Sequence, residues 1–209
     1  MQFFVTGIGT EVGKTVISAI LTEALEADYW KPVQSGDLHY SDSDKVKALI
    51  SNNKTKFHPE CYRLQTPASP HISAAIDGIE ISPKAFQLPE SDNHLIVEGA
   101  GGLMVPLNSN FLIIDLIKQL NIPVIIVSKN YLGSINHTIL SIEALQKRNI
   151  PIAGIIFNGP DTPSTQDFIL ENTQIPYIGR IEESSTIIDK DFVVTNAGKI
   201  KENIIKLIS

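Results

Sequence analysis

Short apolar runs alternate with amphipathic helical patterns along the whole chain. Runs without intervening polar positions are typical of buried strands, and apolar residues that return every three or four positions are typical of helices. The strands are predicted over residues 3–6, 29–33, 95–97, 123–128, 152–157 and 177–181. The helices are predicted over residues 14–27, 42–50, 111–120, 134–148, 166–172 and in a last segment with Ala197, Ile200, Ile204 and Leu207 on one face. Residues 52–69 have little periodicity and predict a loop.

This alternation determines the predicted fold class. Uniformly apolar strands separated by helices indicate a mostly parallel sheet that helices cover on both faces. No stretch rich in Pro, Gly or Ser divides the chain, so we expect one doubly wound α/β domain over residues 1–209. The composition agrees, because 43% apolar and 19% charged residues lie within the globular range.

Charge and cysteine content narrow the class of partner. With 17 basic and 23 acidic residues the net charge is −6, which disfavours nucleic acid and anionic membranes as partners. Cys61 is the lone cysteine, so no internal disulfide can form. No basic leader and no apolar run near the ~20 residues of a membrane span is present. We therefore expect a cytoplasmic protein.

Residues 6–15 read TGIGTEVGKT and lie between the first predicted strand and the first predicted helix. Such a loop binds phosphate, because glycines let backbone N–H groups converge and the helix N-terminus favours an anion. Lys14 would reach the β- and γ-phosphates, and the Thr15 hydroxyl would hold Mg²⁺. Five residues separate Gly7 from Gly13, one more than is usual. The alternative is a glycine-rich turn without a ligand, but the pattern favours a P-loop NTPase fold.

Three further charged residues are candidates for the same site. Glu98 follows the apolar run 95–97 and precedes Gly99-Ala100-Gly101-Gly102, at a strand end where ligands of α/β sheets collect. Lys31 stands at the end of a second apolar strand, where a lysine is unusual unless it binds an anion. The alternative is that its side chain extends along the apolar surface and places the ammonium group in solvent. Asp44 is a weaker candidate, because a helix N-cap explains an acid in that segment equally well.

Five segments together are similar to the dethiobiotin synthetase family, in the order in which the family has them. They are residues 7–15, 31–36 (KPVQSG), 69–71 (SPH), 98–102 (EGAGG) and 132–137 (LGSINH), and they span about three quarters of the chain. The resemblance implies an ATP- and Mg²⁺-dependent ligase of biotin biosynthesis. In this family CO₂ adds to one amine of 7,8-diaminononanoate, the carbamate takes the γ-phosphoryl group of ATP, and the second amine closes the cyclic urea of dethiobiotin.

The resemblance also assigns roles to residues. Lys31 and Lys14 would be catalytic, stabilising the carbamate and the transferring phosphoryl group. The metal ligands would be Thr15, Asp44 and Glu98. The nucleotide would contact Thr10, Glu11, Val12, Gly13, Lys14, Thr15, Val16, Asp44, Glu98, Gly99, Ala100, Gly101 and Asn158. The substrate would contact Ser35 and, through the start of a helix supplied by the neighbouring subunit, Gly133, Ser134, Ile135 and Asn136. A shared site of this kind implies a homodimer.

The resemblance is thinnest around the nucleobase. Asn158 stands where the family has an adenine-reading Asn, but Gly159 and Pro160 follow it, and Glu182 replaces a frequent proline. ATP remains the expected nucleotide.

Three other functions are less consistent with the sequence. A partition- or division-type ATPase would carry an additional lysine early in the loop, and none precedes Lys14 there. A cobyrinate-amidating synthetase needs an amidotransferase domain for which the chain is too short. A nucleotide-binding module without turnover would not require both Lys31 and Glu98.

Overall fold

The computed structural model describes residues 1–184 and 187–208, and its centre is a sheet of seven parallel strands. The strand order is β11-β10-β9-β1-β6-β2-β4. The strands are β1 (Gln2–Gly7), β2 (Asp28–Trp30), β4 (Phe57–His58), β6 (Leu95–Gly102), β9 (Val124–Lys129), β10 (Ile152–Asn158) and β11 (Tyr177–Ile181). The predicted α/β fold with a doubly wound parallel sheet is confirmed.

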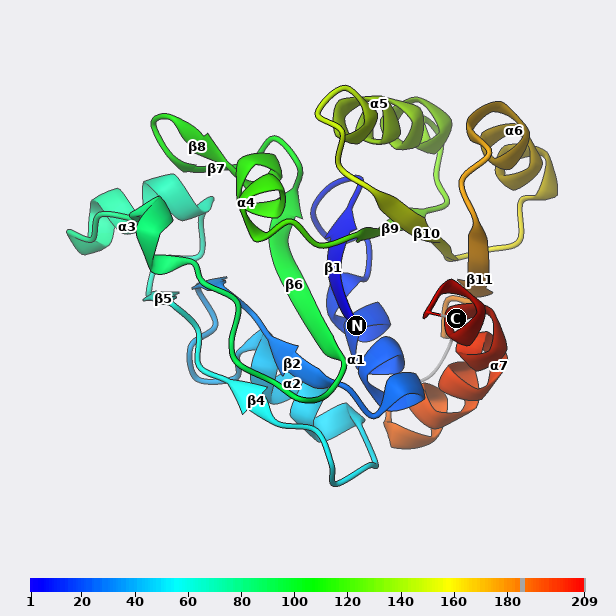
Figure 1. Ribbon diagram of the computed structural model, residues 1–209, viewed down its shortest axis with the longest axis horizontal. Coiled ribbons are helices and arrows are strands. Elements are labelled where there is room, and N and C mark those ends of the chain that lie inside the picture. Colours follow the sequence, from blue (N-terminus) through cyan, green and yellow to red (C-terminus); the bar gives the residue numbers. More distant parts are fainter. Residues whose placement is uncertain (185–186, 209) are drawn as a thin grey trace.

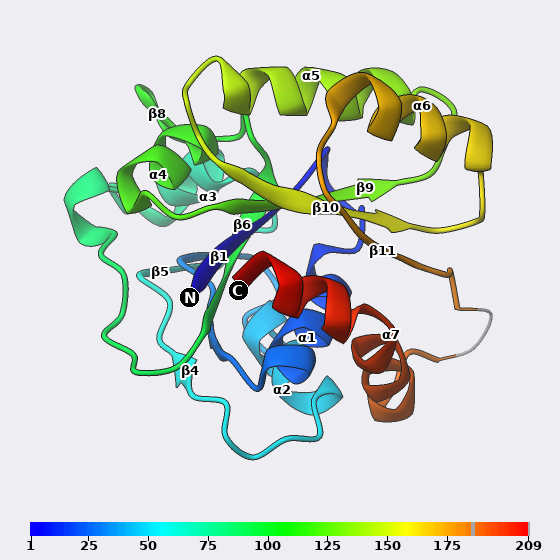
Figure 2. The same ribbon diagram turned by 45° about the vertical axis from the view of Figure 1, so that its right-hand side comes forward.

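Helices cover both faces of this sheet (Figure 1; Figure 2 turns the view by 45°). One face carries α1 (Lys14–Leu25), α2 (Asp42–Leu49) and α7 (Lys190–Ile208). The other face carries α3 (Pro70–Asp77), α4 (Ile113–Leu120), α5 (Ser134–Gln146) and α6 (Pro163–Thr173). None of the helices in the described ranges combines the length and the apolar character needed to cross a bilayer.

The central strands are mostly apolar because both of their faces are buried. Successive side chains of a strand point to opposite faces. Accordingly, Phe3 and Val5 of β1 pack in the cluster under α1, whereas Phe4 packs in the cluster under α4 and α5. All three side chains are buried, so the sheet separates two hydrophobic cores.

The predicted strand over 29–33 is two strands. β2 ends at Trp30, and β3 (Val33–Ser35) pairs with β5 (Tyr62–Leu64) in a separate two-stranded sheet. Pro32 lies at the break, where a residue without an N–H group cannot continue a ladder. The chain therefore leaves the main sheet at Lys31, at the carboxyl end of β2.

Other boundaries also differ from the predictions. β4 and β5 lie within residues 52–69, which were predicted to be a loop. β6 continues through Glu98 to Gly102, with a register shift between the pairs Val5–Glu98 and Gly7–Gly102. The predicted helix over 111–120 begins with the short strand β8 (Phe111–Leu112), which pairs antiparallel with β7 (Pro106–Asn108). A short 3₁₀ helix, η1, spans Pro83–Ala85.

Candidate active site

The predicted phosphate loop connects β1 to α1. Gly13 precedes α1 with a φ of 93°, a left-handed conformation that favours glycine. A Cβ atom at Gly13 would lie 2.2 Å from Nδ2 of Asn158, so the position also lacks room for a side chain. Lys14 begins the helix and turns back over the loop, where its Nζ donates to the Gly9 carbonyl at 3.0 Å. The ammonium group of Lys14 and the N-terminus of α1 therefore both lie at the phosphate loop.

Lys14 is not in an ordinary lysine environment. Burial, together with the positive charge of Lys31, lowers the pKa of Lys14 to about 8 from its usual 10.5. Glu98 and Asp42 oppose this shift but do not cancel it. Two neighbouring buried ammonium groups favour an anion between them, and a phosphate group would satisfy both.

Glu98 accepts three hydrogen bonds, from α1, from β2 and from Lys31 directly after β2. Its Oε1 receives the Thr15 hydroxyl at 2.9 Å and the Lys31 ammonium at 3.0 Å. Its Oε2 receives the Tyr29 hydroxyl at 2.9 Å. The carboxylate is 1% exposed, and these donors are what allow a charge to be buried there. The alternative that Glu98 is an ordinary charge at a strand end is inconsistent with this arrangement.

Lys31 is buried between two carboxylates. Its Nζ lies 2.6 Å from Oδ2 of Asp42 and 3.0 Å from Oε1 of Glu98, and it donates to the Gly99 carbonyl at 3.4 Å. Burial alone would lower the pKa of Lys31, but Glu98 and Asp42 outweigh burial and raise it above the ordinary value. Lys31 is therefore a fixed cation. It does not extend to solvent, which was the alternative considered from the sequence.

Asp44 lies outside this group, in contrast to the sequence prediction. Its carboxylate accepts the Ser41 backbone N–H at 2.9 Å and the Ser41 hydroxyl at 2.7 Å, and the Ser41 hydroxyl in turn accepts the Asp44 N–H. This is a capping box at the start of α2. The carboxylate that reaches Lys31 belongs to Asp42, one helical residue after the cap. The structure thus brings Asp42, and not the predicted Asp44, to the ammonium group of Lys31.

A cavity of about 770 Å³ joins these groups. The predicted residues that line it are Thr10, Glu11, Gly13, Lys14, Thr15, Val16, Lys31, Ser35, Glu98, Ala100 and Gly101. Sequence reasoning missed several others, including Gln34, Asp37, Asp42, Lys45 and Pro67–Pro70. Of these, Ser69 and Pro70 lie in the SPH segment that carried part of the family resemblance.

Two polar side chains line the cavity next to one another in the sequence, Gln34 with hydrogen-bond partners and Ser35 without. Gln34 accepts the Asp42 backbone N–H at 3.1 Å and donates to the Gly36 carbonyl, so it ties the start of α2 to β3. The buried Ser35 hydroxyl has no hydrogen-bond partner within the described ranges 1–184 and 187–208. A buried hydroxyl without a partner is costly, and a polar ligand in the cavity would satisfy it.

Three further predicted nucleotide contacts, Val12, Gly99 and Asn158, do not line the cavity. Asn158, at the end of β10, donates its Nδ2 to the Val12 carbonyl at 2.9 Å. Val12 itself is buried in the loop, and a Cβ atom at Gly7 would lie 2.4 Å from its Cγ2. These contacts fix the shape of the phosphate loop from the neighbouring strand.

The predicted carboxylate-binding segment, Gly133 to Asn136, lies at a different hollow. Together with Tyr131, Leu132, Ile139, Leu140 and Thr165 these four residues line a hollow of about 530 Å³. Gly133 is the N-cap of α5, and the Ser134 N–H is already bonded to the Tyr131 carbonyl at 2.9 Å. The first helical bond runs from His137 to Gly133, so the N–H groups of Ile135 and Asn136 remain available at the helix start.

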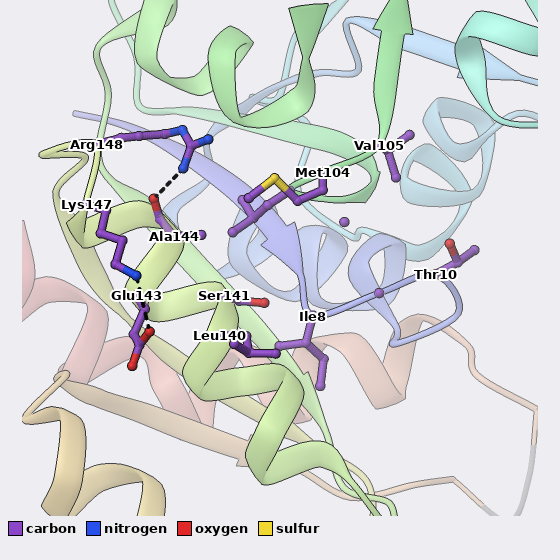
Figure 3. Close-up of a pocket in the computed structure, with 13 residues that line it drawn as sticks. Ile8, Thr10, Met104, Val105, Leu140, Ser141, Glu143, Ala144, Lys147 and Arg148 are labelled. Carbon is purple, nitrogen blue, oxygen red and sulfur yellow. Dashed lines mark hydrogen bonds and ion pairs between the residues drawn. The ribbon is translucent and has the colours of Figure 1, made fainter.

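A third hollow, of about 620 Å³, is shown in Figure 3. Its wall joins the phosphate loop and the turn after β6 to α5. Thr10 and Val105 line both this hollow and the Lys31 cavity, and Leu140 lines both this hollow and the one at the start of α5. Met104 and Leu140 are about half exposed there. On a single chain, the third hollow therefore connects the Lys31 cavity to the hollow at the start of α5, but those two do not share a lining residue.

Comparisons with known proteins agree with the motifs. The family described as an AAA domain matches residues 1–190. The ATP-dependent dethiobiotin synthetase BioD of Christiangramia forsetii is 56% identical over 182 residues, which cover 87% of each chain. The protein of the same name from Cytophaga hutchinsonii is 45% identical over 203 residues, covering 97% of this chain and 98% of its own. The chain belongs to the dethiobiotin synthetase family.

Solved structures show that this dethiobiotin synthetase family member has the P-loop ATPase fold. The septum site-determining protein MinD of Pyrococcus horikoshii, complexed with Mg-ADP, has a TM-score of 0.58 at 14% identity, covering 99% of this chain and 94% of its own. A ParA family ATPase of Chlorobium tepidum has a TM-score of 0.54 at 14% identity, covering 98% and 92%. At this identity the likeness concerns the fold alone.

The oxygen atoms around Lys31 suit a magnesium ion bound with ATP in a dethiobiotin synthetase. Thr15, Asp42 and Glu98 offer a hydroxyl and two carboxylates, the hard donors that Mg²⁺ prefers. Residues 1–184 and 187–208 contain no group of three or more His, Cys, Asp and Glu side chains that could hold a metal by themselves. Mg²⁺ bound to a nucleotide needs only a few protein ligands, because phosphate oxygens and water molecules supply the other coordination positions.

Proposed function

We propose that the protein carries out the ATP-dependent conversion of 7,8-diaminononanoate and CO₂ to dethiobiotin, with release of ADP and phosphate. The observation that carries this proposal is the position of Lys31. A buried ammonium group at the mouth of a phosphate loop, held by two carboxylates, is more than nucleotide binding requires. It suits a reaction in which a second anion, a carbamate, must lie beside the γ-phosphate.

The proposed chemistry has three steps. One amine of the substrate adds to CO₂ and loses a proton, which gives a carbamate. A carbamate oxygen attacks the γ-phosphorus, ADP leaves, and a carbamic–phosphoric anhydride forms. The second amine attacks the carbamate carbon and expels phosphate, which closes the cyclic urea. Every species up to ring closure is anionic at the reacting end, so fixed cations stabilise each transition state.

The chain's own residues divide this work. Lys14 and the loop N–H groups hold the β- and γ-phosphates, and Lys31 stabilises the carbamate and the phosphoryl group in transfer. Ser35, which lines the same cavity and has a buried hydroxyl without a partner, offers that hydroxyl to the diamine end of the substrate. Thr15, Glu98 and Asp42, the last in place of Asp44, would hold Mg²⁺, which neutralises phosphate charge when bound.

We further propose that two copies complete each site. The N–H groups at the start of α5 would bind the substrate carboxylate through the helix dipole, without a basic side chain. On one chain this helix start opens onto a separate hollow, and Leu132 beside it is fully exposed. A partner that covers the apolar surface around Met104, Leu132 and Leu140 would bring its own α5 start towards the Lys31 cavity.

The deciding experiment follows product and stoichiometry together. The protein is incubated with 7,8-diaminononanoate, ¹³C-bicarbonate and Mg-ATP. We expect dethiobiotin with one ¹³C atom in the urea carbonyl, and one ADP for each product molecule. ATP hydrolysis that neither requires nor responds to the diamine would contradict the proposal.

A further inference from the structure

The buried hydroxyl of Tyr29 has a partner that the reaction does not explain. It donates to Oε2 of Glu98 at 2.9 Å, while Thr15 and Lys31 both donate to Oε1. We propose that Tyr29 is a positioning residue that fixes the rotation of the Glu98 carboxylate and thereby presents Oε1 to a divalent cation. This inference rests on the proposed function, because it requires Mg²⁺ to bind at Thr15 and Glu98.

The register of the sheet explains the reach of Tyr29. Tyr29 of β2 lies opposite Ile96 of β6, and Glu98 follows two residues later on the same face of β6. The tyrosine ring crosses to the neighbouring strand towards its carboxyl end, where the hydroxyl meets Oε2. A phenylalanine at position 29 could fill the same core but would leave Oε2 without this donor.

The ring of Tyr29 is held independently of its hydroxyl. It packs against Phe57 with ring centroids 5.6 Å apart, and its backbone N–H donates to the Lys56 carbonyl at 2.9 Å. The side chain is fully buried. The hydroxyl is therefore presented from a rigid position. A hydrogen bond from a rigid donor selects one orientation of a carboxylate that could otherwise rotate.

The hydroxyl also keeps its proton. Burial, and then the negative charges of Glu98 and Asp42, raise the pKa of Tyr29 well above 10. Tyr29 does not itself line the cavity, whereas Glu98 does, so the contribution of Tyr29 to the site is the orientation of Glu98.

The test is Tyr29→Phe, which removes the hydroxyl and keeps the ring. The readout is Mn²⁺ binding to the protein–ADP complex, followed by the EPR signal of free Mn²⁺. Removing a partner of a metal ligand costs about 10- to 100-fold in metal affinity, and we expect a loss near the lower limit. ADP binding measured in EDTA should be unchanged. The matched control is Tyr62→Phe, which removes a hydroxyl that accepts the Ser82 N–H at 2.9 Å, away from the site; its Mn²⁺ affinity should equal that of the parent.

A double variant separates positioning from general damage. If Tyr29 acts through Glu98, adding Tyr29→Phe to Glu98→Gln should change Mn²⁺ affinity no further. Unchanged Mn²⁺ affinity in Tyr29→Phe, or an equal loss of metal-free ADP binding, would overturn the inference while leaving the proposed function intact. A parent protein in which nucleotide binding does not respond to Mn²⁺ would instead overturn the proposed metal site and, with it, the role of Tyr29.

Discussion

Lys31 forms its ion pair with Asp42, at 2.6 Å, and not with Asp44, although both acids lie in the first turn of α2. The difference follows from the helix cap. Ser41 and Asp44 satisfy one another, which leaves Asp42 free to turn towards the sheet. The ion pairs of Lys31 thereby join the end of β2 to the start of α2 and to Glu98 of β6.

The first prediction compares the two lysines. Lys31→Met should lower turnover by roughly 10²-fold or more, the scale for losing one fixed charge at a transition state. It should leave ATP affinity less affected than Lys14→Met does, because Lys14 holds phosphate already in the ground state. Steady-state kinetics with calorimetric ATP titrations would show this division. Unchanged turnover in Lys31→Met would remove Lys31 from the mechanism.

The second prediction concerns the two acids of α2. Asp42→Asn should raise the Mg²⁺ concentration needed for half-maximal turnover, because a charged oxygen ligand is lost. Asp44→Asn, its matched control, should leave the Mg²⁺ dependence unchanged and lower the free energy of unfolding by about 0.5 kcal/mol, because a negative charge in the first turn of α2 is lost. Activity against Mg²⁺ and urea unfolding curves measure the two effects. If Asp44→Asn raised the Mg²⁺ requirement and Asp42→Asn did not, the metal ligand would be Asp44.

The third prediction uses the low pKa of Lys14. With a pKa of about 8, Lys14 loses its proton in the ligand-free protein as the pH rises through 8. A bound polyphosphate favours the ammonium form and raises that pKa. ATP binding at about pH 8.5 should therefore take up part of a proton, and affinity should fall as the pH increases.

Calorimetry in buffers of different ionisation enthalpy measures this uptake directly. The nucleotide itself contributes little to the proton uptake, because the phosphate of a monoester has a pKa of about 6 and is already deprotonated at about pH 8.5. Lys14→Met should show no uptake. A parent protein that binds ATP without proton uptake would mean that Lys14 is already fully charged before binding.

The fourth prediction addresses the substrate carboxylate. The methyl ester of the diamine should bind markedly worse than the acid, because backbone N–H groups at the start of α5 bind a charge. Asn136→Pro should weaken substrate binding more than ATP binding, since it removes one of the free N–H groups without breaking a helical bond. Ser134→Ala should change affinity little, because the Ser134 side chain does not cap the helix. Equal affinity for acid and ester would place the carboxylate elsewhere.

The fifth prediction tests the two-copy site. The double variant Met104→Glu/Leu140→Glu places charges on the apolar hollow of Figure 3, and should give a monomer that binds ATP but loses the diamine. Phe168→Glu is the control, since Phe168 is similarly exposed but lies on α6. Light scattering and separate binding titrations supply the readouts. Full activity in a proven monomer would contradict a shared site.

The sequence predicted those parts of the site that local patterns specify. The phosphate loop could be recognised because glycines, a lysine and a helix start are adjacent in the chain. Glu98 and Lys31 could be recognised because each directly follows an apolar run of a parallel strand, and such strands direct their carboxyl ends to one edge of the sheet. The fold class followed from the same alternation.

The remaining features depend on side-chain direction and on distant contacts. Asp42 and Asp44 carry the same chemistry two residues apart, and only the capping box decides which one is free. The strand break at Pro32 was hidden by apolar residues on both sides of it. α3 was not predicted, although Pro70 after Ser69 is a helix-start signal. The role proposed for Tyr29 has no sequence signal, since an aromatic residue in a buried strand is ordinary.

The position of β1 in the sheet has a consequence for biosynthesis. β1 is synthesised before both of its neighbours in the sheet, which are β6, at residues 95–102, and β9, at residues 124–129. Until residue 129 has been made, at least one edge of the strand that leads into the phosphate loop has no partner. Unpaired apolar edges promote aggregation during synthesis. A nascent chain released before β9 is complete would therefore contain every residue of the phosphate loop and still be exposed to misassembly.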